Sequence, residues 1–297
     1  MRVLSFGSLN IDYVYDVPHF ITRGETMAAL ALNTYSGGKG LNQSVALSKA
    51  GLEVFHAGAV GEEGLFLISE LESAGVNTKY IARLKDIRTG HTIIQRNSDG
   101  DNCIILFGGA NRQITREQID STLADFSKGD ALVIQNEIND IEYMASRAQE
   151  LGMIVAFNPS PMEEKIIPVF KYADYILLNE VEAGQFLRQD ITALSPEDIA
   201  KSLLKALPDS KIVLTLGTNG SVYADKNIMF RQNAIKVNAV DTTAAGDTFT
   251  GFFLSGIFGG QTPEWSMKFA SHASAIAVTR PGAAPSVPTR EEVLAKI

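Results

Sequence analysis

The feature that most constrains the fold is an alternation of short apolar runs with amphipathic segments. The apolar runs expected to form strands are residues 3–6, 54–60, 131–135, 154–157, 175–178 and 212–216. The segments expected to form helices are residues 41–50, 65–74, 141–151, 199–207, 248–258 and 265–279, of which the last two are the final helices of the chain. Because parallel strands need helical crossovers, this order predicts an α/β fold with helices on the faces of a parallel sheet.

Two regions interrupt this alternation. Residues 12–17 and 27–35 are expected to be extended without a helix between them, and residues 90–96 and 102–107 flank Asp99-Gly100. Asp-Gly between apolar runs predicts a hairpin, because glycine adopts positive φ without strain. We therefore expect a small β-rich subdomain formed by two inserted segments. The pattern alone does not decide between a lid and a dimer contact.

Composition excludes several classes of protein. A chain of 297 residues suits one large domain or two unequal ones. Its 26 basic and 34 acidic side chains give a net charge of −8, which argues against non-specific binding to nucleic acid or to anionic membranes. The single cysteine, Cys103, excludes an intrachain disulfide and a multi-cysteine zinc site. We expect Cys103 in the core, with a reactive thiol as the alternative.

Several other functional patterns are missing from the sequence. The N-terminus has no basic segment followed by an apolar stretch, and the longest uncharged stretch, residues 248–263, is too short and too polar to cross a bilayer. We therefore expect a cytoplasmic protein. No Gly-x-Ser-x-Gly elbow supplies a hydrolase nucleophile. The scattered histidines form no metal-binding pattern, and we interpret them as structural or surface residues: His19, His56, His91 and His272.

A glycine-rich cluster, Ser36-Gly37-Gly38-Lys39-Gly40-Leu41-Asn42-Gln43-Ser44, lies between extended chain and a predicted helix. Three glycines allow a ligand to approach the backbone closely, and the helix N-terminus favours an anion or a hydroxyl oxygen. A glycine-rich turn with a solvated lysine is the alternative. The cluster is not a Walker A loop, since Gly40 follows Lys39, and it lacks the third glycine of a dinucleotide fingerprint.

A second cluster, Asp241-Thr242-Thr243-Ala244-Ala245-Gly246-Asp247-Thr248-Phe249, leads directly into a predicted helix. Small residues at a helix start expose backbone N–H groups that can bind an anion. A carboxylate beside such an anion hole suits phosphoryl transfer, which needs a base for the acceptor hydroxyl and donors for the developing charge. The alternative is that Asp247 is only the N-cap of the helix.

Two further segments follow predicted strands. Thr215-Leu216-Gly217-Thr218-Asn219-Gly220 has the position of a nucleotide-binding loop, although an ordinary β-turn explains it equally well. Asn179-Glu180-Val181-Glu182 lies at the carboxyl end of a strand, where ligands gather in open α/β sheets. Its carboxylates and amide suit Mg²⁺ bound through water, and a solvated helix start is the alternative.

The glycine cluster and the Asp247 cluster together resemble the two signature segments of the ribokinase/phosphofructokinase-B family of sugar kinases. The likeness extends from Gly7-Ser8-Leu9-Asn10-Ile11-Asp12 to Val278-Thr279-Arg280-Pro281-Gly282-Ala283, and it is greatest with the ribokinases of that family. It implies a three-layer αβα core with a mostly parallel sheet and a small β-sheet lid. The core would comprise residues 1–9, 37–88 and 112–297, and the lid residues 10–36 and 89–111.

The resemblance also implies an activity and its site residues. The activity is ATP-dependent phosphorylation of the terminal primary hydroxyl of a pentose, with D-ribose as the first choice. Asp247 would be the base, and Ala244, Ala245 and Gly246 the anion hole. The sugar-binding residues would be Asn10, Asp12, Gly38, Lys39, Asn42, Glu137 and Asp247. The ATP-binding residues would be Asn179, Thr215, Gly217 and Gly220.

The resemblance further implies metal ions and partners. Glu182 would act on Mg²⁺ through water. A monovalent cation, expected to be K⁺, would be bound by Asp241, Thr243, Ala277, Arg280, Gly282 and Ser286. The partners would be a sugar and ATP, without nucleic acid or membrane, and a homodimer through the lid is one option. The chain departs from the family pattern at Gly251-Phe252, where two small residues are usual.

Other functions stay open. Within the same family the substrate could be a ketohexose, a deoxyribose or a nucleoside, because these differ from ribose by one or two hydroxyl contacts. A catalytically silent sugar-binding protein on the same fold is the alternative from a different class.

Overall fold

A computed structural model of the chain describes residues 1–98 and 101–297. Among these residues, nine strands form a sheet in the order β13-β12-β11-β10-β9-β8-β1-β4-β5. Every neighbouring pair from β11 to β5 is parallel, and β12 and β13 form an antiparallel edge. The strands are β1 (Arg2–Phe6), β4 (Glu53–Val60), β5 (Asn77–Arg83), β8 (Ala131–Gln135), β9 (Ile154–Asn158), β10 (Tyr175–Asn179), β11 (Lys211–Thr215), β12 (Ser221–Ala224) and β13 (Met229–Gln232).

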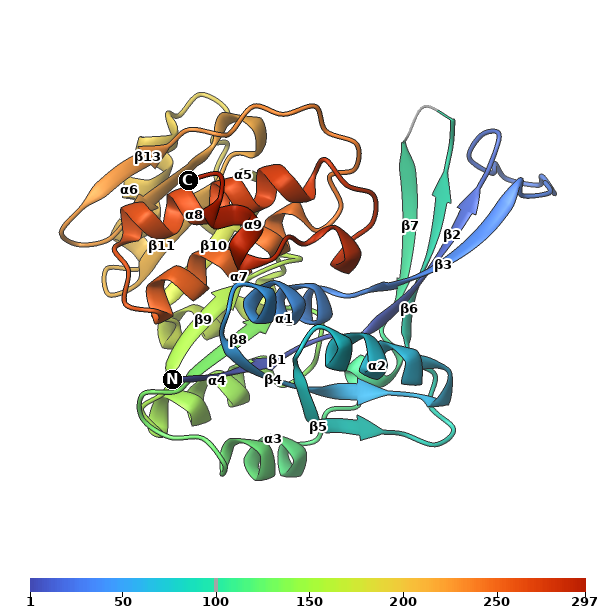
Figure 1. Cartoon of the computed structure of the whole chain (residues 1–297), viewed down its shortest axis with the longest axis horizontal. Coiled ribbons are helices and arrows are strands. Elements are labelled where there is room, and N and C mark those ends of the chain that lie inside the picture. Colours follow the sequence, from blue (N-terminus) through green and yellow to red (C-terminus); the bar gives the residue numbers. More distant parts are fainter. Residues whose placement is uncertain (99–100) are drawn as a thin grey trace.

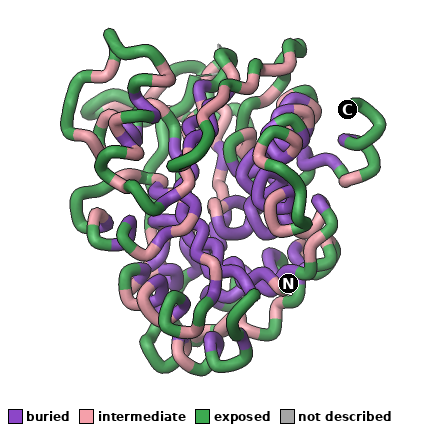
Figure 2. The backbone as a smooth tube through the Cα atoms, turned by 90° about the vertical axis from the view of Figure 1, so that its left-hand side faces the viewer, coloured by how far each residue is buried: buried purple, intermediate pink, exposed green. Residues whose placement is uncertain are grey.

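Helices cover both faces of this sheet, as Figure 1 shows. On one face lie α3 (Arg116–Leu123), α4 (Ile141–Glu150), α5 (Glu180–Leu187) and α6 (Pro196–Ala206). On the other lie α1 (Lys39–Lys49), α2 (Leu65–Ser73), α7 (Ala245–Phe258), α8 (Pro263–Ala277) and α9 (Arg290–Leu294). Side chains alternate across a strand, so Leu4 enters one core and Val3 the other. The buried interior of Figure 2 therefore consists of two apolar layers, one on each side of the sheet, and the predicted three-layer α/β fold is confirmed.

A second, smaller sheet extends away from this body, on the right of Figure 1. Its strands are β2 (Asn10–Asp16), β3 (Ala31–Gly37), β6 (Gly90–Arg96) and β7 (Asn102–Phe107), in the order β3-β2-β6-β7. The central pair β2–β6 is parallel and the outer pairs are antiparallel. The strands come from the two segments that interrupt the sequence alternation. Asp99-Gly100, the predicted hairpin turn, lies outside the described residues.

Cys103 is exposed, so the prediction that it is a core residue was wrong. Its strand β7 is an edge strand of the small sheet, and all six of its residues are exposed. The apolar run Cys103-Ile104-Ile105-Leu106-Phe107 has the composition of a buried strand, but no layer of the described chain covers it. Composition identified the strand correctly and its burial incorrectly.

The predicted strands and helices agree with the structure to within a few residues, with three differences. Residues 27–30 precede β3 and are not part of a strand. Helix α9 follows the two helices that we expected to be the last. It starts with a capping box formed by Thr289 and Glu292, a sequence pattern that the alternation of apolar and amphipathic segments does not include. The prediction also omitted β5, β12, β13 and α3, and it gave the start of α5 only as the alternative for Asn179-Glu180-Val181-Glu182.

Gly251 and Phe252, where the chain departs from the family pattern, point toward different helices. A Cβ on Gly251 would lie 2.4 Å from the Ala46 side chain on α1, so α1 and α7 approach closely at this glycine. Phe252 is fully buried and contacts Phe269 on α8, with 4.9 Å between the ring centroids. The large side chain of Phe252 therefore lies on the α8 side of α7 and does not hinder the close packing of α1 against Gly251.

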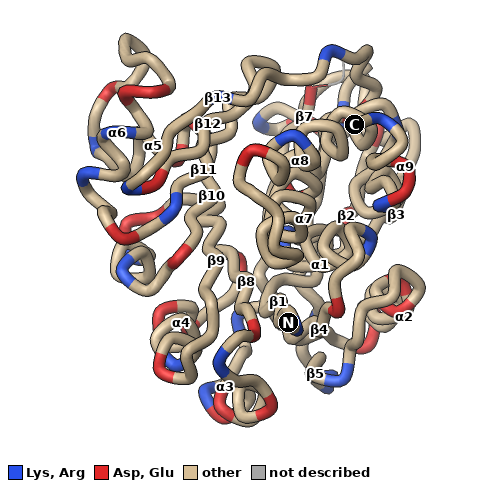
Figure 3. The backbone as a smooth tube through the Cα atoms, turned by 60° about the vertical axis from the view of Figure 1, so that its left-hand side comes forward, with Lys and Arg blue, Asp and Glu red and all other residues tan. Residues whose placement is uncertain are grey.

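Charged residues of both signs are interspersed over the outer helices, as Figure 3 shows. No helix among the described residues is long and apolar enough to span a membrane.

Candidate active site

The start of α7 has an unusual cap. Ala244 is the N-cap residue in the left-handed conformation, with φ of 57°, and no side chain caps the helix. Ala244, Ala245 and Gly246 line a pocket of about 530 Å³, open solvent included. Asp247 follows as the third residue of the helix, so the interpretation of Asp247 as an N-cap was wrong. The Ala245 N–H donates to the Thr242 carbonyl oxygen over 3.2 Å. The N–H groups of Gly246 and Asp247, which have no acceptor within the helix, are therefore the ones available to an anion in this pocket.

The carboxylate of Asp247 is buried and held by two side-chain amides of α1. Asn42 donates from Nδ2 to Asp247 Oδ2 over 3.1 Å, and Gln43 donates from Nε2 to Oδ1 over 2.9 Å. Helices α1 and α7 pack side by side on one face of the sheet, and this packing brings residues 204 and 205 positions apart into contact. The two sequence clusters thus form one site.

Lys39 begins α1 at the turn formed by the glycine cluster. Gly38, the N-cap residue, has φ of 94°, which favours glycine, and a Cβ there would lie 3.0 Å from the Ser8 carbonyl oxygen. The backbone N–H of Lys39 donates to Glu137 Oε2 over 2.9 Å, and Ser8 Oγ donates to the same oxygen. Burial opposes the charge on the half-buried ammonium, but nearby carboxylates outweigh burial and raise the pKa of Lys39; they are Asp247, Glu137 and Glu182.

Asn10 and Asp12 lie on one face of β2, where the chain enters the small sheet. Asn10 Oδ1 accepts from Asn111 Nδ2 over 2.7 Å, and Asp12 Oδ1 accepts from Thr92 Oγ1 over 2.6 Å. Burial raises the pKa of Asp12; the bond from Thr92 opposes this shift, and the charge of Glu137 adds to it. Both predicted sugar contacts are thus fixed in place by neighbouring side chains.

Asn179 and Glu182 form a capping box at the start of α5. Asn179 Oδ1 accepts from the Glu182 N–H, and Glu182 Oε2 accepts from the Asn179 N–H, each over 2.9 Å. Thr215 ends the adjacent strand β11, and its Oγ1 donates to the Leu178 carbonyl oxygen over 3.4 Å. Both segments therefore lie at the carboxyl ends of neighbouring parallel strands.

The pocket unites some, but not all, of the predicted residues. It is lined by Lys39, Asn158, Ser160, Leu177, Leu178, Asn179, Glu182, Thr215, Thr242, Ala244, Ala245, Gly246, Asp247 and Thr250. Gly217 and Gly220, with φ of 55° and 93°, belong to the turn after Thr215 and do not line it. Asn10, Asp12, Gly38, Asn42 and Glu137 also lie outside the lining. Asn42 and Glu137 are joined to it by their bonds to Asp247 and to the backbone of Lys39.

The residues predicted to bind a monovalent cation come from two loops that the Asp241 carboxylate holds together. It accepts from the Thr243 N–H and from the Gly282 N–H, each over 2.9 Å. Burial alone would raise the pKa of Asp241, but these bonds and the charge of Arg96 lower it. The Ala277 carbonyl oxygen accepts a hydrogen bond from the Arg280 N–H at the end of α8. Ser286, four residues after Gly282, is buried. The Arg280 guanidinium is positively charged and pairs with Glu292, so Arg280 could bind a cation only through its backbone carbonyl oxygen.

Sequence reasoning gave no role to several polar residues around Asp247. Gln43 bonds Asp247 directly, Gln135 and Asn158 bond Gln43, and Ser8 bonds Glu137. Asn158 ends β9 and Gln135 ends β8, so their position at the carboxyl ends of strands was the available signal.

Comparisons with known proteins identify the family of the chain. The family model of the pfkB family carbohydrate kinases matches residues 1–290. The ribokinase of Haemophilus influenzae is 30% identical over 292 residues, which cover 97% of this chain and 95% of the relative. The structure of a ribokinase from Thermotoga maritima matches with a TM-score of 0.88 and 35% identity, covering 99% of this chain and 98% of that one. The structure of Arabidopsis thaliana ribokinase complexed with ribose and ATP matches with a TM-score of 0.87 and 27% identity, covering 99% and 97%. The chain therefore belongs to the pfkB family of carbohydrate kinases.

Proposed function

We propose that this chain is an ATP-dependent kinase that phosphorylates the terminal primary hydroxyl of D-ribose, giving ribose 5-phosphate. The observation that carries the proposal is the position of Asp247 beside the uncapped start of α7, in the pocket lined by Ala244, Ala245 and Gly246. A base for the acceptor hydroxyl and donors for the transferred group then face the same space. The similarity to ribokinases over nearly the whole chain supports ribose as the acceptor.

In the proposed reaction, Asp247 accepts the proton of the sugar hydroxyl while the sugar oxygen forms a bond to the γ-phosphorus of ATP. The bond between that phosphorus and the oxygen bridging to ADP breaks, and its electron pair leaves with ADP. The first-turn N–H groups of α7 hold the charge of the transferred phosphoryl group. Catalysis is therefore mostly positioning and charge stabilisation.

The proposed sugar contacts are Asn10, Asp12, Gly38, Lys39, Asn42 and Glu137. Carboxylates and amides suit a ligand with many hydroxyls, and a site built from them rejects analogues that lack one. Asn42 links sugar binding to the base. Its Nδ2 donates to Asp247, whereas its buried Oδ1 has no hydrogen-bond partner among the described residues.

The proposed ATP site comprises Asn179, Thr215, Gly217 and Gly220, with Mg²⁺ near Glu182. The described part of the chain holds no cluster of three or more His, Cys, Asp or Glu side chains suited to a metal ion. This fits Mg²⁺, which typically takes one or two protein carboxylates and fills its other positions with water and substrate phosphate. Glu182 and Asp247 are the carboxylates of the pocket. When bound, Mg²⁺ would neutralise phosphate charge.

The loops joined by Asp241 also fit the proposed K⁺ site. The available donors are oxygens: the Asp241 carboxylate, the Ser286 and Thr243 hydroxyls, and backbone carbonyls of Ala277, Arg280 and Gly282. Carbonyl oxygens of this kind replace the hydration shell of K⁺ in proteins. Bound K⁺ would add positive charge to the loop that precedes the anion hole.

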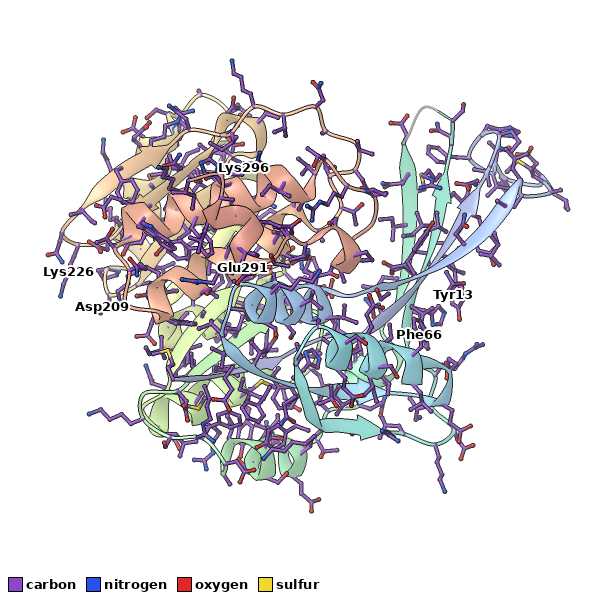
Figure 4. The ribbon with its side chains drawn as sticks, viewed as in Figure 1. Tyr13, Phe66, Asp209, Lys226, Glu291 and Lys296 are labelled. Atoms are coloured by element: carbon purple, nitrogen blue, oxygen red, sulfur yellow. The ribbon has the colours of Figure 1, made fainter. Side chains whose placement is uncertain are left out.

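We also propose that the small sheet is a lid that forms a homodimer contact. Four apolar side chains of β7 are 46–64% exposed: Ile104, Ile105, Leu106 and Phe107. Monomeric proteins rarely leave such a contiguous apolar edge uncovered. Tyr13, labelled in Figure 4, marks the same sheet at the edge of the molecule.

The test is ADP release from ATP and Mg²⁺ with D-ribose, deoxyribose, fructose and several nucleosides, each with and without K⁺. We expect the fastest turnover with D-ribose and acceleration by K⁺. Faster turnover with another acceptor would keep the base and the anion hole but overturn the ribose assignment. If sugar binds in calorimetry without ADP release, the silent binding protein becomes the better description.

A further inference from the structure

Gln43 has no part in the transfer described above, yet its side chain contacts the base. It follows Asn42 on α1 and is completely buried. Its Nε2 donates to Asp247 Oδ1, while Asn42 holds Oδ2. Two consecutive residues of one helix therefore hold both oxygens of the carboxylate.

The hydrogen bonds around Gln43 determine which way its side-chain amide is oriented. An ionised carboxylate only accepts, so the amide nitrogen of Gln43 faces Asp247. Its oxygen then faces Gln135, whose Nε2 donates to Gln43 Oε1 over 2.7 Å. Gln43 Nε2 also donates to Asn158 Oδ1 over 3.0 Å, and Asn158 Nδ2 donates to the Leu177 carbonyl oxygen over 2.8 Å. The Gln43 amide is thus held by groups on α7, β8 and β9.

We propose that Gln43 is a positioning residue that fixes the orientation of the Asp247 carboxylate for proton transfer. The inference rests on the proposed function, in which Asp247 takes the hydroxyl proton. The terminal torsion of an aspartate is broad, and a base works only when one of its oxygens points at the proton. Asp247 lines the pocket and Gln43 does not, so Gln43 holds the carboxylate without entering the space that the sugar and ATP would occupy.

The first test is Gln43→Met, which keeps the length of the side chain and removes its donor and acceptor. We expect kcat with D-ribose to fall about 10- to 100-fold, since small misplacements of reacting groups have effects of this order. KM for ribose and for ATP should change less than threefold, because Gln43 lies outside the pocket. A wild-type kcat in the folded variant would overturn the inference.

Ser255→Ala is the matched control. Ser255 Oγ donates to the Ala50 carbonyl oxygen over 2.9 Å and so joins α7 to the end of α1, about two helical turns from Asp247. Its loss should lower the melting temperature and leave kcat unchanged. If Ser255→Ala lowers kcat as much as Gln43→Met does, loosening of the helix pair explains both, and the inference fails.

The second test repeats Gln43→Met in an Asp247→Asn background. With no base to orient, the added substitution should lower the residual rate less than threefold. Equal losses in both backgrounds would assign Gln43 a purely structural role. If Asp247→Asn alone keeps wild-type turnover, the proposed base is wrong, and this outcome is distinct from a failure of the Gln43 inference.

Gln43→Glu tests the inference if the methionine variant does not fold. Its carboxyl has nearly the same shape and can donate to Asp247 only when protonated. The charged groups facing this position are Asp247 and, next to Asp247, Lys39; its other contacts are uncharged amides. We expect kcat of the variant relative to the wild type to rise as the pH falls from 8 to 6. A pH profile identical to that of the wild type would overturn the inference.

Discussion

Asp247 is the residue on which the proposed chemistry depends. Asp247→Asn preserves the size of the side chain and removes the proton acceptor, so kcat should fall about 10²- to 10⁴-fold, the usual contribution of a general base. ATP affinity measured by calorimetry should change little. Asp209→Asn, an identical change at an exposed position labelled in Figure 4, is the control and should have wild-type kinetics. Wild-type turnover in Asp247→Asn would contradict the assignment.

His56 should make the stability of the protein depend on pH. It is fully buried, its Nδ1 lies 2.7 Å from Ser44 Oγ, and burial lowers its pKa to about 3. In the unfolded chain the histidine pKa is about 6.5, so as the pH falls the unfolded chain binds a proton at a higher pH than the folded protein does. The contribution of neutral His56 to the free energy of unfolding is therefore fully present above pH 6.5 and is lost as the pH falls toward 3. Between pH 7 and pH 5 the loss should be about 2 kcal/mol.

Urea unfolding at pH 7 and at pH 5 measures this loss. The His56→Gln variant lacks the titrating group, so its free energy of unfolding should fall less between these pH values than that of the wild type. Equal pH dependence in the two proteins would show that His56 is not the source.

At single residues, the sequence was most informative where function restricts the residue type. Asp247, Lys39 and Asn42 were selected from their motifs, and they lie around one pocket. Gln43 was quoted in the same motif without a role, because its function depends on contacts with Asn158 and Asp247 that only the fold creates. The roles of all these residues stay predictions until tested.

At the level of helices, the contact between α1 and α7 should tolerate no added volume at Gly251. A methyl group there would lie 2.4 Å from the Ala46 side chain and 2.8 Å from the Leu47 nitrogen. Gly251→Ala should therefore lower the free energy of unfolding by about 1–3 kcal/mol, as overpacking does in other cores, and this change is measurable by urea denaturation. Gly184→Ala is the control, since its Cβ would make only ordinary contacts of 3.4 Å and longer. A Gly251→Ala protein as stable as the Gly184→Ala protein would contradict the close approach.

The exposed strand β7 gives a prediction about assembly. If the small sheet forms the dimer contact, Ile105→Glu should produce monomers in sedimentation velocity at concentrations where the wild type is dimeric, because a buried charge without a partner is costly. Ile228→Glu makes the same change at an exposed isoleucine in the turn between β12 and β13, close in sequence to Lys226, which Figure 4 labels at the opposite end of the molecule. It should remain dimeric. A wild-type protein that is monomeric throughout would overturn the dimer proposal.

Two of the strands that the sequence did not predict are weakly buried, whereas a third, β12, is completely buried but has only four residues. Strand β5 is an edge strand with no fully buried residue, and β13 has four residues at the opposite edge. Both give only a faint apolar pattern, whereas central strands such as β8 are completely buried and were readily recognised. Helix α9 spans only five residues. Periodicity reports burial, and burial is lowest at the edges of the sheet.

For the molecule as a whole, the two sheets should differ in their resistance to local opening. Strand β1 is buried and paired on both sides, by β4 and β8, whereas β7 is paired only with β6 and is exposed. In hydrogen–deuterium exchange, β1 and β8 should exchange most slowly and β7 most rapidly. D-ribose should slow exchange in β2, which carries Asn10 and Asp12. Equal exchange in both sheets, unchanged by ribose, would contradict the proposed lid.

The close contact of α1 and α7 at Gly251 has a consequence for how such an enzyme can acquire a new substrate. The proposed base and its amide partners depend on a helix spacing that Gly251 and Ala46 set, whereas Asn10 and Asp12 belong to a sheet that leaves the core. Two of the proposed sugar contacts, Asn10 and Asp12, are thereby encoded apart from the base and its amide partners, whereas Lys39 and Asn42 belong to α1 itself. We therefore expect laboratory evolution confined to β2 and β6 to alter the contacts of Asn10 and Asp12 with the acceptor while the base stays in place, and the same number of substitutions on α1 and α7 to lower activity more strongly.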